Sequence, residues 1–402
     1  MRILYYSPNP NLNLTDPAGY GTHMREMIRA FREMGHEVDI QVLGGTEQRP
    51  ASTEVKQPFF KRLAKAMIPP RRWQTMKDQR LITFDDQAYD NLLAHIKKTK
   101  PDLVYERANY MQVSGVNAAK KAGVMHILEM NSPYVEEKLE LEGNSGLLDE
   151  ARQREAWQLN KSKHVVVVSS SLKEYFMHEH RTFGGKFSVI PNAIDPEKGN
   201  VSEDHVHAVR QQFGLEGKTV IGWVGSIQPW HGIQALINGF TNVAKSVPEA
   251  VLLVVGSGET IAQMKSLAEA SGVGERIHFT GYIPHDRVFA HIAAMDVCVL
   301  PDTKWYCSPI KIFEYGLMGK AIVATQHAAV LDVMVPDVDG LIIEPGMPEQ
   351  LEAALVRLLR DPQLRSELGG RFQEKVLREH TWAANARKVV EIWEFAQTSF
   401  AR

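Results

Sequence analysis

Two side chains that suit a nucleotide ligand stand three residues apart. Lys311 and Glu314 follow a Ser-Pro pair, Ser308-Pro309, which is typical of a helix start with Ser308 at the N-cap and Pro309 in the first helical position. Residues three apart share a helix face. There the lysine and the helix N-terminus would attract a diphosphate, and the carboxylate would accept hydrogen bonds from ribose hydroxyls. The alternative is an ordinary helix with a solvated lysine and a solvated glutamate.

The flanking segments place this helix in a βαβ unit. Short apolar runs at 296–300 and 321–325 lie on either side of it, and Gly319 follows its last apolar residues. That order predicts strand, helix, strand. In parallel sheets, ligands bind where a strand ends and the next helix begins, so the sequence predicts a phosphate site at this edge.

Length and composition limit the protein class. The chain has 402 residues, 44% apolar and 23% charged, with a formal charge of -2, which predicts two soluble domains and no nucleic-acid partner. Two cysteines, Cys298 and Cys307, give neither a disulfide framework nor a metal-ligand spacing. The first residues turn polar too soon for a signal peptide, and no apolar run approaches the roughly 18 to 20 residues of a membrane span. We therefore expect a cytoplasmic protein.

The first half of the chain alternates apolar runs with helical patterns, which predicts parallel strands with helices on both faces. Strands are expected at 3–6, 38–42, 102–105, 124–129, 164–168 and 187–190, with helices near 24–35, 111–121, 147–160 and 171–178. The segment Pro191–Pro196 breaks the pattern. We place the domain boundary there, giving an N-terminal domain of 1–195 with an insert at about 45–80.

The alternation restarts after the boundary. Further strands are expected at 219–224, 251–255 and 276–280, and further helices at 233–247, 260–270, 349–359, 362–379 and 384–396. The fold class is α/β, with two doubly wound Rossmann-like domains facing a central cleft. The second domain spans 196–384, and the last helix, in 385–402, is expected to pack back on the first domain.

The glycine pairs do not complete a known dinucleotide or ATP fingerprint. Gly256 and Gly258 are followed by Ile261 where G-x-G-x-x-G needs glycine, and Gly19 and Gly21 are followed by Met24 in the same way. Gly316 and Gly319 have only two residues between them, too few for a P-loop. NAD binding and ATP hydrolysis are therefore not predicted.

Several segments together resemble a known family. The order S-P-x-K-x-F-E-Y-x-x-x-G-K from Ser308 to Lys320, followed by A-I-V-A-T, is similar to the donor-site motif of the family-4 retaining glycosyltransferases of the GT-B fold. Gly35-His36-Glu37-Val38 and Pro191-Asn192-Ala193-Ile194-Asp195 also fit the family. The resemblance implies transfer of a hexose from a UDP- or GDP-linked sugar to a glycan or lipid-linked acceptor, with no metal and no cofactor.

The resemblance also implies roles for individual residues. Those expected to bind the donor are Gly19, Ser226, Gly258, Tyr282, Ser308, Pro309, Ile310, Lys311 and Glu314. Those expected to take part in catalysis are Gly21, Glu129, Asn131 and His231. The segment Ala18–His23, which contains Gly19 and Gly21, resembles the family's glycine loop, although two glycines in a loop also suit a plain turn. Glu129 and Asn131 lie where many relatives have a sugar-facing histidine, and a solvated Glu129 before an ordinary turn is the alternative.

Three positions depart from the family pattern. Tyr306 stands where the family's two-glutamate motif has its first carboxylate, and Ser226 and His231 stand where relatives carry arginine and lysine. A serine brings no charge to a phosphate, and a neutral histidine is a weaker anion partner than lysine. A binding or scaffold protein that has lost turnover is therefore a second hypothesis. A nucleotide-sugar epimerase of the same fold is a third and weaker one.

Other acidic and histidine patterns suit structural roles. Asp337-Val-Asp339 precedes a glycine in an expected surface turn, and Asp85-Asp86 is expected to be a helix N-terminal pair. Fifteen histidines occur without a paired helical spacing, so no zinc site is predicted.

The segment from Lys56 to Arg80 is strongly basic. It holds eight Lys or Arg and one acid, Asp78. Phe59, Phe60, Leu63 and Met67 form one helical stripe before Pro69-Pro70. Such a segment suits an anionic membrane surface, which would make the protein peripheral at the inner face. A helix docked on its own domain with a solvated basic face is an equal alternative.

Overall fold

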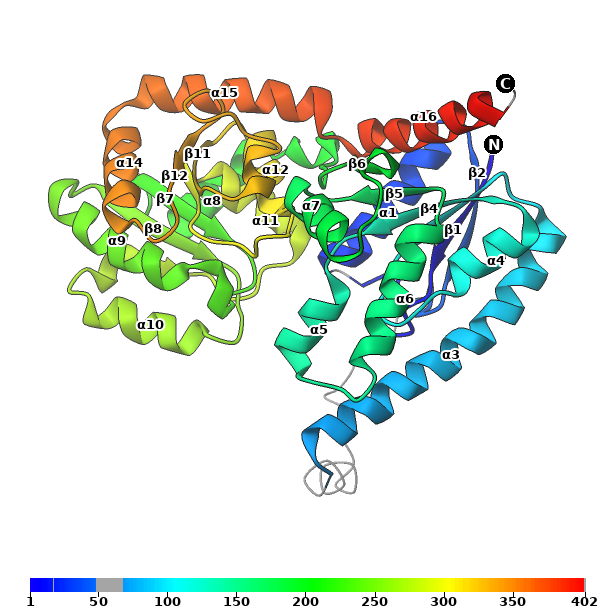
Figure 1. Cartoon of the computed structure of the whole chain (residues 1–402). Helices are drawn as coiled ribbons and strands as arrows, with labels where there is room; N and C mark the ends of the chain where they lie inside the picture. Colours follow the sequence, from blue (N-terminus) through cyan, green and yellow to red (C-terminus); the bar gives the residue numbers. More distant parts are fainter. Residues whose placement is uncertain (17, 48–67, 401–402) are drawn as a thin grey trace. The chain divides into compact units, whose positions relative to one another are not determined.

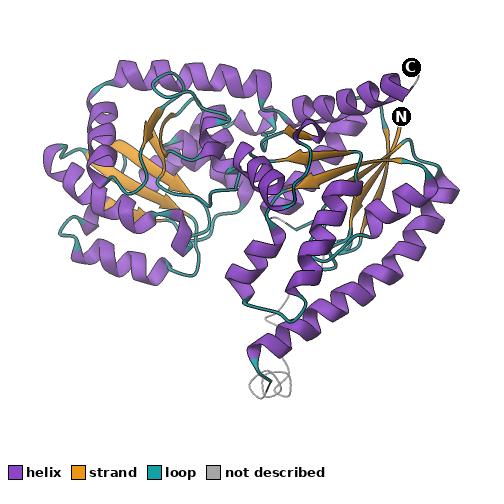
Figure 2. Cartoon of the chain, in the orientation of Figure 1, coloured by secondary structure: helices purple, strands orange, loops and turns teal. Residues whose placement is uncertain are grey.

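The computed structural model describes residues 1–16, 18–47 and 68–400. The chain divides into two compact units. The N-terminal unit comprises Met1–Ile190 together with the residues from Asn385 onward, and the C-terminal unit comprises Pro191–Ala384. Each unit is a sheet flanked by helices (Figure 2).

The N-terminal unit is built on a parallel sheet of six strands in the order β2-β1-β3-β4-β5-β6. Figure 1 labels its elements, which are β1 (Arg2–Ser7), α1 (Gly19–Glu33), β2 (Glu37–Val42), α3 (Pro70–Thr99), β3 (Leu103–Arg107), α4 (Ser114–Ala122), β4 (Met125–Met130), α5 (Tyr134–Glu142), α6 (Leu148–Lys161), β5 (His164–Val167), α7 (Ser170–Glu179), β6 (Phe187–Val189) and the part of α16 (Trp382–Phe400) from Asn385 onward.

The C-terminal unit repeats the plan with the strand order β12-β11-β10-β7-β8-β9, again all parallel. Its elements are α8 (Glu203–Gln212), β7 (Thr219–Val224), α9 (Ile233–Ser246), β8 (Ala250–Val255), α10 (Ile261–Ala270), β9 (Ile277–Phe279), α11 (His285–Ala293), β10 (Val297–Leu300), α12 (Ile310–Leu317), β11 (Ala321–Thr325), α13 (Ala328–Leu331), β12 (Leu341–Ile343), α14 (Pro348–Arg360) and α15 (Pro362–Glu379). The predicted α/β fold class with two doubly wound sheets is confirmed.

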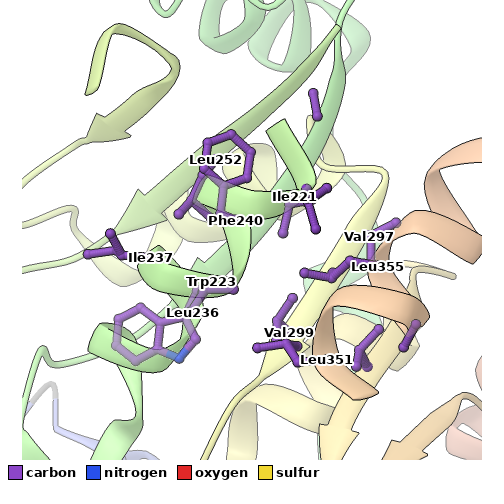
Figure 3. Close-up of a cluster of buried hydrophobic side chains, with 14 of the residues drawn as sticks. Ile221, Trp223, Leu236, Ile237, Phe240, Leu252, Val297, Val299, Leu351 and Leu355 are labelled. Carbon is purple, nitrogen blue, oxygen red and sulfur yellow. The ribbon is translucent and has the colours of Figure 1, made fainter. Parts of the chain in front are cut away.

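Alternating side chains along each strand give the C-terminal sheet a core on both faces. Ile221 and Trp223 of β7 point to one face, where Leu236 and Phe240 of α9 and Leu355 of α14 cover them (Figure 3). Strands buried on both faces are apolar at nearly every position, as in parallel sheets generally. This explains why the strand positions were readable as continuous apolar runs.

The long helix α3 was not predicted, because its buried stripe is partly polar. Its buried residues recur at helical spacing but begin with Gln74, Asp78 and Asp85 before continuing with Ala88, Leu92 and Ile96. Asp85 lies inside α3, so its expected place at a helix N-terminus is wrong. Its carboxylate instead accepts hydrogen bonds from the backbone amides of Val113 and Ser114, at 2.8 and 3.0 Å, and so caps α4. Helices α5, α8, α11 and α13 and strand β12 were also unforeseen.

Part of the basic segment lies outside the described residues. This applies to Phe59, Phe60, Leu63 and Met67 and to the predicted stripe they form. The described part begins with Ile68, and Pro70 is the first residue of α3. Among the helices in the described ranges, none combines the length and hydropathy that a bilayer crossing requires.

Candidate active site

Helix α12 begins at Ile310, one residue later than the Ser-Pro pattern predicts. Pro309 is the N-cap and has no side-chain acceptor. Ser308 precedes it, and its hydroxyl accepts a hydrogen bond from the Asn192 backbone amide at 2.9 Å, while the Asn192 side chain donates to the Ser308 carbonyl at 2.6 Å. The predicted capping role of Ser308 is therefore wrong. Among the described residues, the N–H groups of Ile310 and Lys311 are left for a ligand, whereas that of Ile312 donates to the Pro309 carbonyl at 3.2 Å.

Lys311 carries a buried charge. Its ammonium nitrogen is buried, has no hydrogen-bond partner in the described part of the chain, and lies 4.3 Å from the centre of the Trp223 ring. The same nitrogen lies 3.0 Å from the position that a Cβ atom on Gly225 would occupy. Burial lowers the pKa of Lys311 to about 8, although Glu314 acts in the opposite direction. A buried cation without an acceptor is energetically costly, and an anionic ligand would supply the missing acceptors.

His231 stands beside this lysine as a neutral group. Its Nδ1 lies 2.5 Å from the carbonyl oxygen of Ser226, and since a carbonyl can only accept, Nδ1 carries the proton. Burial and then the charge of Lys311 lower the pKa of His231 to about 4. At neutral pH the Nε2 atom therefore offers a lone pair. An incoming anion would raise the pKa of His231, and a proton taken up from solvent would then turn Nε2 into a donor.

Glycines let the loops after β7 and β8 approach each other closely. A Cβ atom on Gly256 would lie 1.9 Å from the carbonyl oxygen of Gly225, and one on Gly258 would lie 2.3 Å from that of Ile227. Gly256 also has a φ of +127°, which disfavours any other residue. Gly258, expected to bind the donor, thus supports the loop that follows β7.

The other predicted donor residues come from α12 and from the segment after β9. Glu314 is 8% exposed and its Oε1 lies 3.2 Å from His285 Nε2. The next residue, Tyr315, accepts a hydrogen bond from the Val224 backbone amide at 2.9 Å, which ties α12 to the end of β7. Tyr282 is 71% exposed. Its ring is thus open to a ligand.

The sheet order brings these segments to one edge. From β7 the chain continues to β8 and β9 on one side of that strand, and it then crosses to β10 and β11 on the other side of β7. This is the topological switch point at which open α/β sheets bind ligands. Ser226, His231 and Lys311 all follow β7 or β10, the two strands at that point. The structure thus gathers polar groups and a helix N-terminus where a diphosphate would fit.

In the N-terminal unit, Glu129 is a buried carboxylate whose oxygen atoms both accept hydrogen bonds. Oε1 accepts from Arg107 at 3.0 Å and from Asn131 at 2.6 Å, and Oε2 accepts from Tyr105 at 2.6 Å. His23 Nε2 lies 2.7 Å from Oε1. Burial alone would raise the pKa of Glu129, but His23, Arg107 and the Tyr105 hydrogen bond together hold it well below its usual range.

The expected glycine loop is the first turn of α1. Gly19 is the first residue of the helix, and Gly21 and His23 belong to it, so the prediction of a loop over Ala18–His23 is wrong. A Cβ atom on Gly21 would lie 2.1 Å from the carbonyl oxygen of Asp16, so the chain before the helix passes too close for a side chain. Gly21 therefore shapes the start of α1, which carries His23 to Glu129.

Several neighbours of the predicted residues were not found from sequence. They are His23, Tyr105 and Arg107 around Glu129, and Trp223, Gly225 and His285 at the C-terminal edge. The sequence could have indicated them only by position, because each lies in or directly after a strand or at the start of a helix. The departure at Tyr306 is a buried residue, 3% exposed, next to the Trp305 ring at 5.2 Å.

The Asp337–Asp339 pattern forms a turn with one buried carboxylate. Asp339 is buried, and its carboxylate accepts hydrogen bonds from the Val335 amide and Lys375, both at 2.9 Å. The expected turn over Asp337–Asp339 is confirmed, with Asp337 at a φ of +57°. In the described ranges no three His, Cys, Asp or Glu side chains gather so as to hold a metal ion.

Two family models match the two halves of the chain. A model of "Glycosyltransferase Family 4" matches residues 17–198, and a model of "Glycosyl transferases group 1" matches residues 218–361. The 2-deoxystreptamine glucosyltransferase of Streptomyces kanamyceticus is 26% identical over 52% of this chain and 54% of its own. For that relative the match therefore spans only about half of its length.

Two further matches extend over nearly the whole chain. The mannosylfructose-phosphate synthase of Agrobacterium fabrum is 22% identical over 97% of this chain and 89% of its own. The crystal structure of HepE from Anabaena in complex with UDP has a TM-score of 0.73 at 16% identity, and covers 98% of this chain and 100% of its own. The fold is thus that of the GT-B glycosyltransferases. Since the two family models together match most of the chain, it belongs to the group 1, family 4 glycosyltransferases.

Proposed function

We propose that the protein transfers a hexose from a UDP- or GDP-linked sugar to a glycan or lipid-linked acceptor, with retention of the anomeric configuration and without a metal ion. The observation that carries the proposal is Lys311, a buried ammonium without an acceptor beside the N-terminus of α12. A diphosphate would supply the acceptors that Lys311 and the helix N–H groups lack. The similarity to the 2-deoxystreptamine glucosyltransferase of Streptomyces kanamyceticus supports the reaction class.

The chemistry requires one bond to form and one to break. The acceptor hydroxyl oxygen bonds to the anomeric carbon, the bond from that carbon to the diphosphate oxygen breaks, and the hydroxyl proton passes to the leaving diphosphate. Because the diphosphate takes both the electron pair and the proton, a separate protein base is not needed. The protein's part is to hold the two reactants and to stabilise the charge of the leaving group.

The candidate residues divide into two roles. Lys311 and the α12 N-terminus would hold the diphosphate, and His231 would become a donor once the phosphate raises its pKa. Glu314, with His285 beside it, would bind the ribose hydroxyls. In the N-terminal unit, Glu129 would orient His23 and Asn131 rather than contact the sugar itself, since both of its oxygens already accept hydrogen bonds.

A catalytically degenerate binding protein is the second candidate. It is favoured by the neutral His231 and the uncharged Ser226, which leave Lys311 as the cation of the phosphate site. The buried Tyr306 stands where the family's two-glutamate motif has its first carboxylate, and it offers none. Such a protein would bind the nucleotide sugar and release it unchanged.

Turnover separates the two candidates. The purified protein is incubated with UDP- and GDP-linked hexoses, with and without a pool of glycan acceptors, and nucleoside diphosphate release is followed together with the anomeric configuration of the product. Release that depends on acceptor, with a retained configuration, is expected. Saturable donor binding without release over hours would favour the binding protein.

The acceptor's location is a further part of the proposal. The basic segment 56–80 would bring the enzyme to an anionic membrane at its cytoplasmic face, where a lipid-linked acceptor is held. The support is the charge of that segment, eight Lys or Arg against one acid. Binding of the protein to anionic vesicles tests this part of the proposal.

A further inference from the structure

The N-terminal unit has a cavity lined mostly by polar and charged side chains. Its volume is about 660 Å³, within the range of roughly 300 to 1,000 Å³ that is usual for small-molecule sites. Helices α3, α4 and α6 form it, and Figure 1 shows α3 running beside α4. The lining side chains are Asp85, Asp86, Tyr89, Asp90, Val113, Ser114, Asn117, Lys120, Lys121 and Trp157.

Trp157 presents a fixed aromatic ring to this cavity. It is 42% exposed, and its indole N–H donates to Asn117 Oδ1 at 2.8 Å. The ammonium groups of Lys120 and Lys161 lie 5.6 and 4.9 Å from its ring centre. The hydrogen bond also orients Asn117, whose side-chain N–H₂ group donates no hydrogen bond within the described ranges. An aromatic ring and an amide donor are thus held next to each other.

The opposite wall offers acceptors. Asp86 and Asp90 lie one turn apart on α3 with Tyr89 between them, and in the part of the chain that the structure describes none of the three side chains makes a hydrogen bond or ion pair. Asp85 and Ser114 are already engaged, because Asp85 caps α4 and Ser114 bonds the Tyr6 hydroxyl at 2.8 Å. The groups open to a ligand are therefore the two outer carboxylates, the phenol, the amide and the lysines.

The charges limit which ligand fits. Lys120 and Lys121 would repel a cation, and a cation already lies over the Trp157 ring. Asp86 and Asp90 would repel an anion. Val113 is the single aliphatic lining residue of this cavity, so its apolar surface comes mainly from rings and from the stems of polar side chains and gives an acyl chain no continuous aliphatic wall. A neutral ligand with many hydroxyl groups meets all of these conditions.

We propose that this cavity binds a neutral oligosaccharide, with one pyranose ring displacing the exposed Lys120 side chain from the Trp157 ring and with its hydroxyl groups bonded to Asp86, Asp90 and Asn117. The C–H face of a pyranose suits an aromatic ring, and carboxylates and amides accept from or donate to hydroxyls. The site uses none of the residues assigned to donor binding or catalysis. It would hold a glycan chain at a second point, whatever reaction the protein performs.

The test is direct binding. The wild-type protein is applied to an array of neutral and acidic oligosaccharides, and the strongest neutral ligand is then titrated by calorimetry, with choline as a cationic probe. Trp157→Ala and the double variant Asp86→Ala/Asp90→Ala are compared with Trp393→Ala. The control residue is another partly exposed tryptophan of the same unit, whose indole also donates one hydrogen bond, to the Asp102 carbonyl at 3.2 Å.

We expect neutral oligosaccharides to bind the wild type and the control equally, and both test variants to bind roughly tenfold more weakly, a change of about 1.4 kcal/mol. Thermal unfolding and nucleoside diphosphate binding should be unchanged in Trp157→Ala, which separates this site from the proposed donor site. The proposal is overturned if no neutral glycan binds the wild type, if Trp157→Ala binds as well as the control, or if choline or acidic glycans bind better than neutral ones.

Discussion

The pKa of Lys311 predicts how ligand binding at the proposed phosphate site depends on pH. Lys311 is buried without a hydrogen-bond acceptor among the described residues, and its pKa is lowered to about 8. A bound diphosphate would raise that pKa, because an opposite charge favours the charged form. Ligand binding at Lys311 should therefore be coupled to proton uptake at alkaline pH.

This coupling gives a prediction for nucleoside diphosphate affinity. Below about pH 8 the ammonium is charged with and without ligand, so the Kd should be constant. Above pH 8 the free protein must first take up a proton, and affinity should fall by up to about tenfold per pH unit. Calorimetry between pH 7 and 9.5 measures this. A Kd that does not change over this range would show that Lys311 does not meet the diphosphate.

Glu129 gives a prediction for stability rather than for binding. Its folded-state pKa is depressed, so its contribution is present above the unfolded pKa of about 4.3 and is lost as the pH falls through the folded value. Glu129→Gln leaves Arg107 buried without its anion, and should lower the free energy of unfolding at pH 7 by about 3 kcal/mol. The difference in free energy of unfolding between the variant and the parent should become smaller at acid pH.

Urea unfolding at pH 7 and at about pH 3, well below the unfolded pKa, measures both effects. The control is Glu33→Gln, which removes a carboxylate that is 62% exposed from the same unit. Its free energy of unfolding should change by less than about 0.5 kcal/mol. Equal effects of the two substitutions at pH 7 would mean that Glu129 is not the centre of a buried ionic cluster.

At the scale of elements, the strands were the easiest part to predict. Buried parallel strands are apolar on both faces, so 219–224 and 321–325 agree with the sequence patterns to the residue. Elements stabilised by polar contacts were missed, and α3 is the clearest case because its buried stripe starts with Gln74, Asp78 and Asp85. The start of α12 was misplaced because the partner of Ser308, Asn192, is 116 residues away in sequence.

The contact between the loops after β7 and β8 should depend on one glycine. Gly256→Ala would place a methyl group 1.9 Å from the Gly225 carbonyl oxygen at a φ of +127°. We expect a loss of about 1 to 3 kcal/mol in stability and weaker nucleoside diphosphate binding, since Gly225 adjoins Lys311. Thermal unfolding and calorimetry measure the two effects.

Gly370→Ala is the matched control. Gly370 lies inside α15 with no atom within 4 Å of an added Cβ, so the substitution should stabilise the protein by about 0.5 to 1 kcal/mol and leave binding unchanged. If Gly256→Ala also kept full ligand affinity, the close approach of the two loops would have no part in the donor site.

At the scale of the whole molecule, the sequence predicted two doubly wound units and the side of the C-terminal sheet that carries the candidate site. It could not predict the partners of Glu129, because Arg107 and Glu129 meet only through the register of β3 against β4. Nor could it place His231 beside Lys311, since His231 follows β7 and Lys311 lies in the first turn of α12, after β10. Pairing across a sheet is a property of the folded chain.

Charge distribution gives a prediction for the whole protein. The segment 56–80 carries a net charge of +7 in a chain of net charge -2, which leaves -9 on the remainder. Binding to anionic vesicles should therefore depend on this segment and weaken as salt screens exposed charges over about 8 Å at physiological ionic strength. Reversing Lys61, Arg62 and Lys65 to Glu should abolish vesicle binding in a flotation assay and leave donor binding intact. If the parent protein does not bind anionic vesicles even at low salt, a soluble acceptor is the better proposal.

The central claim is that the edge of the C-terminal sheet next to Lys311 binds the diphosphate of a nucleotide sugar. It is tested most directly by titrating Lys311→Met with UDP, GDP, uridine and guanosine at pH 7, beside Lys320→Met, which removes another lysine of the same βαβ connection. If Lys311 binds the diphosphate, Lys311→Met should weaken binding of the preferred diphosphate by about 1.5 to 3 kcal/mol and leave binding of its nucleoside nearly unchanged, while Lys320→Met should affect neither. Equal diphosphate affinity in Lys311→Met and the parent would show that the diphosphate does not bind at Lys311.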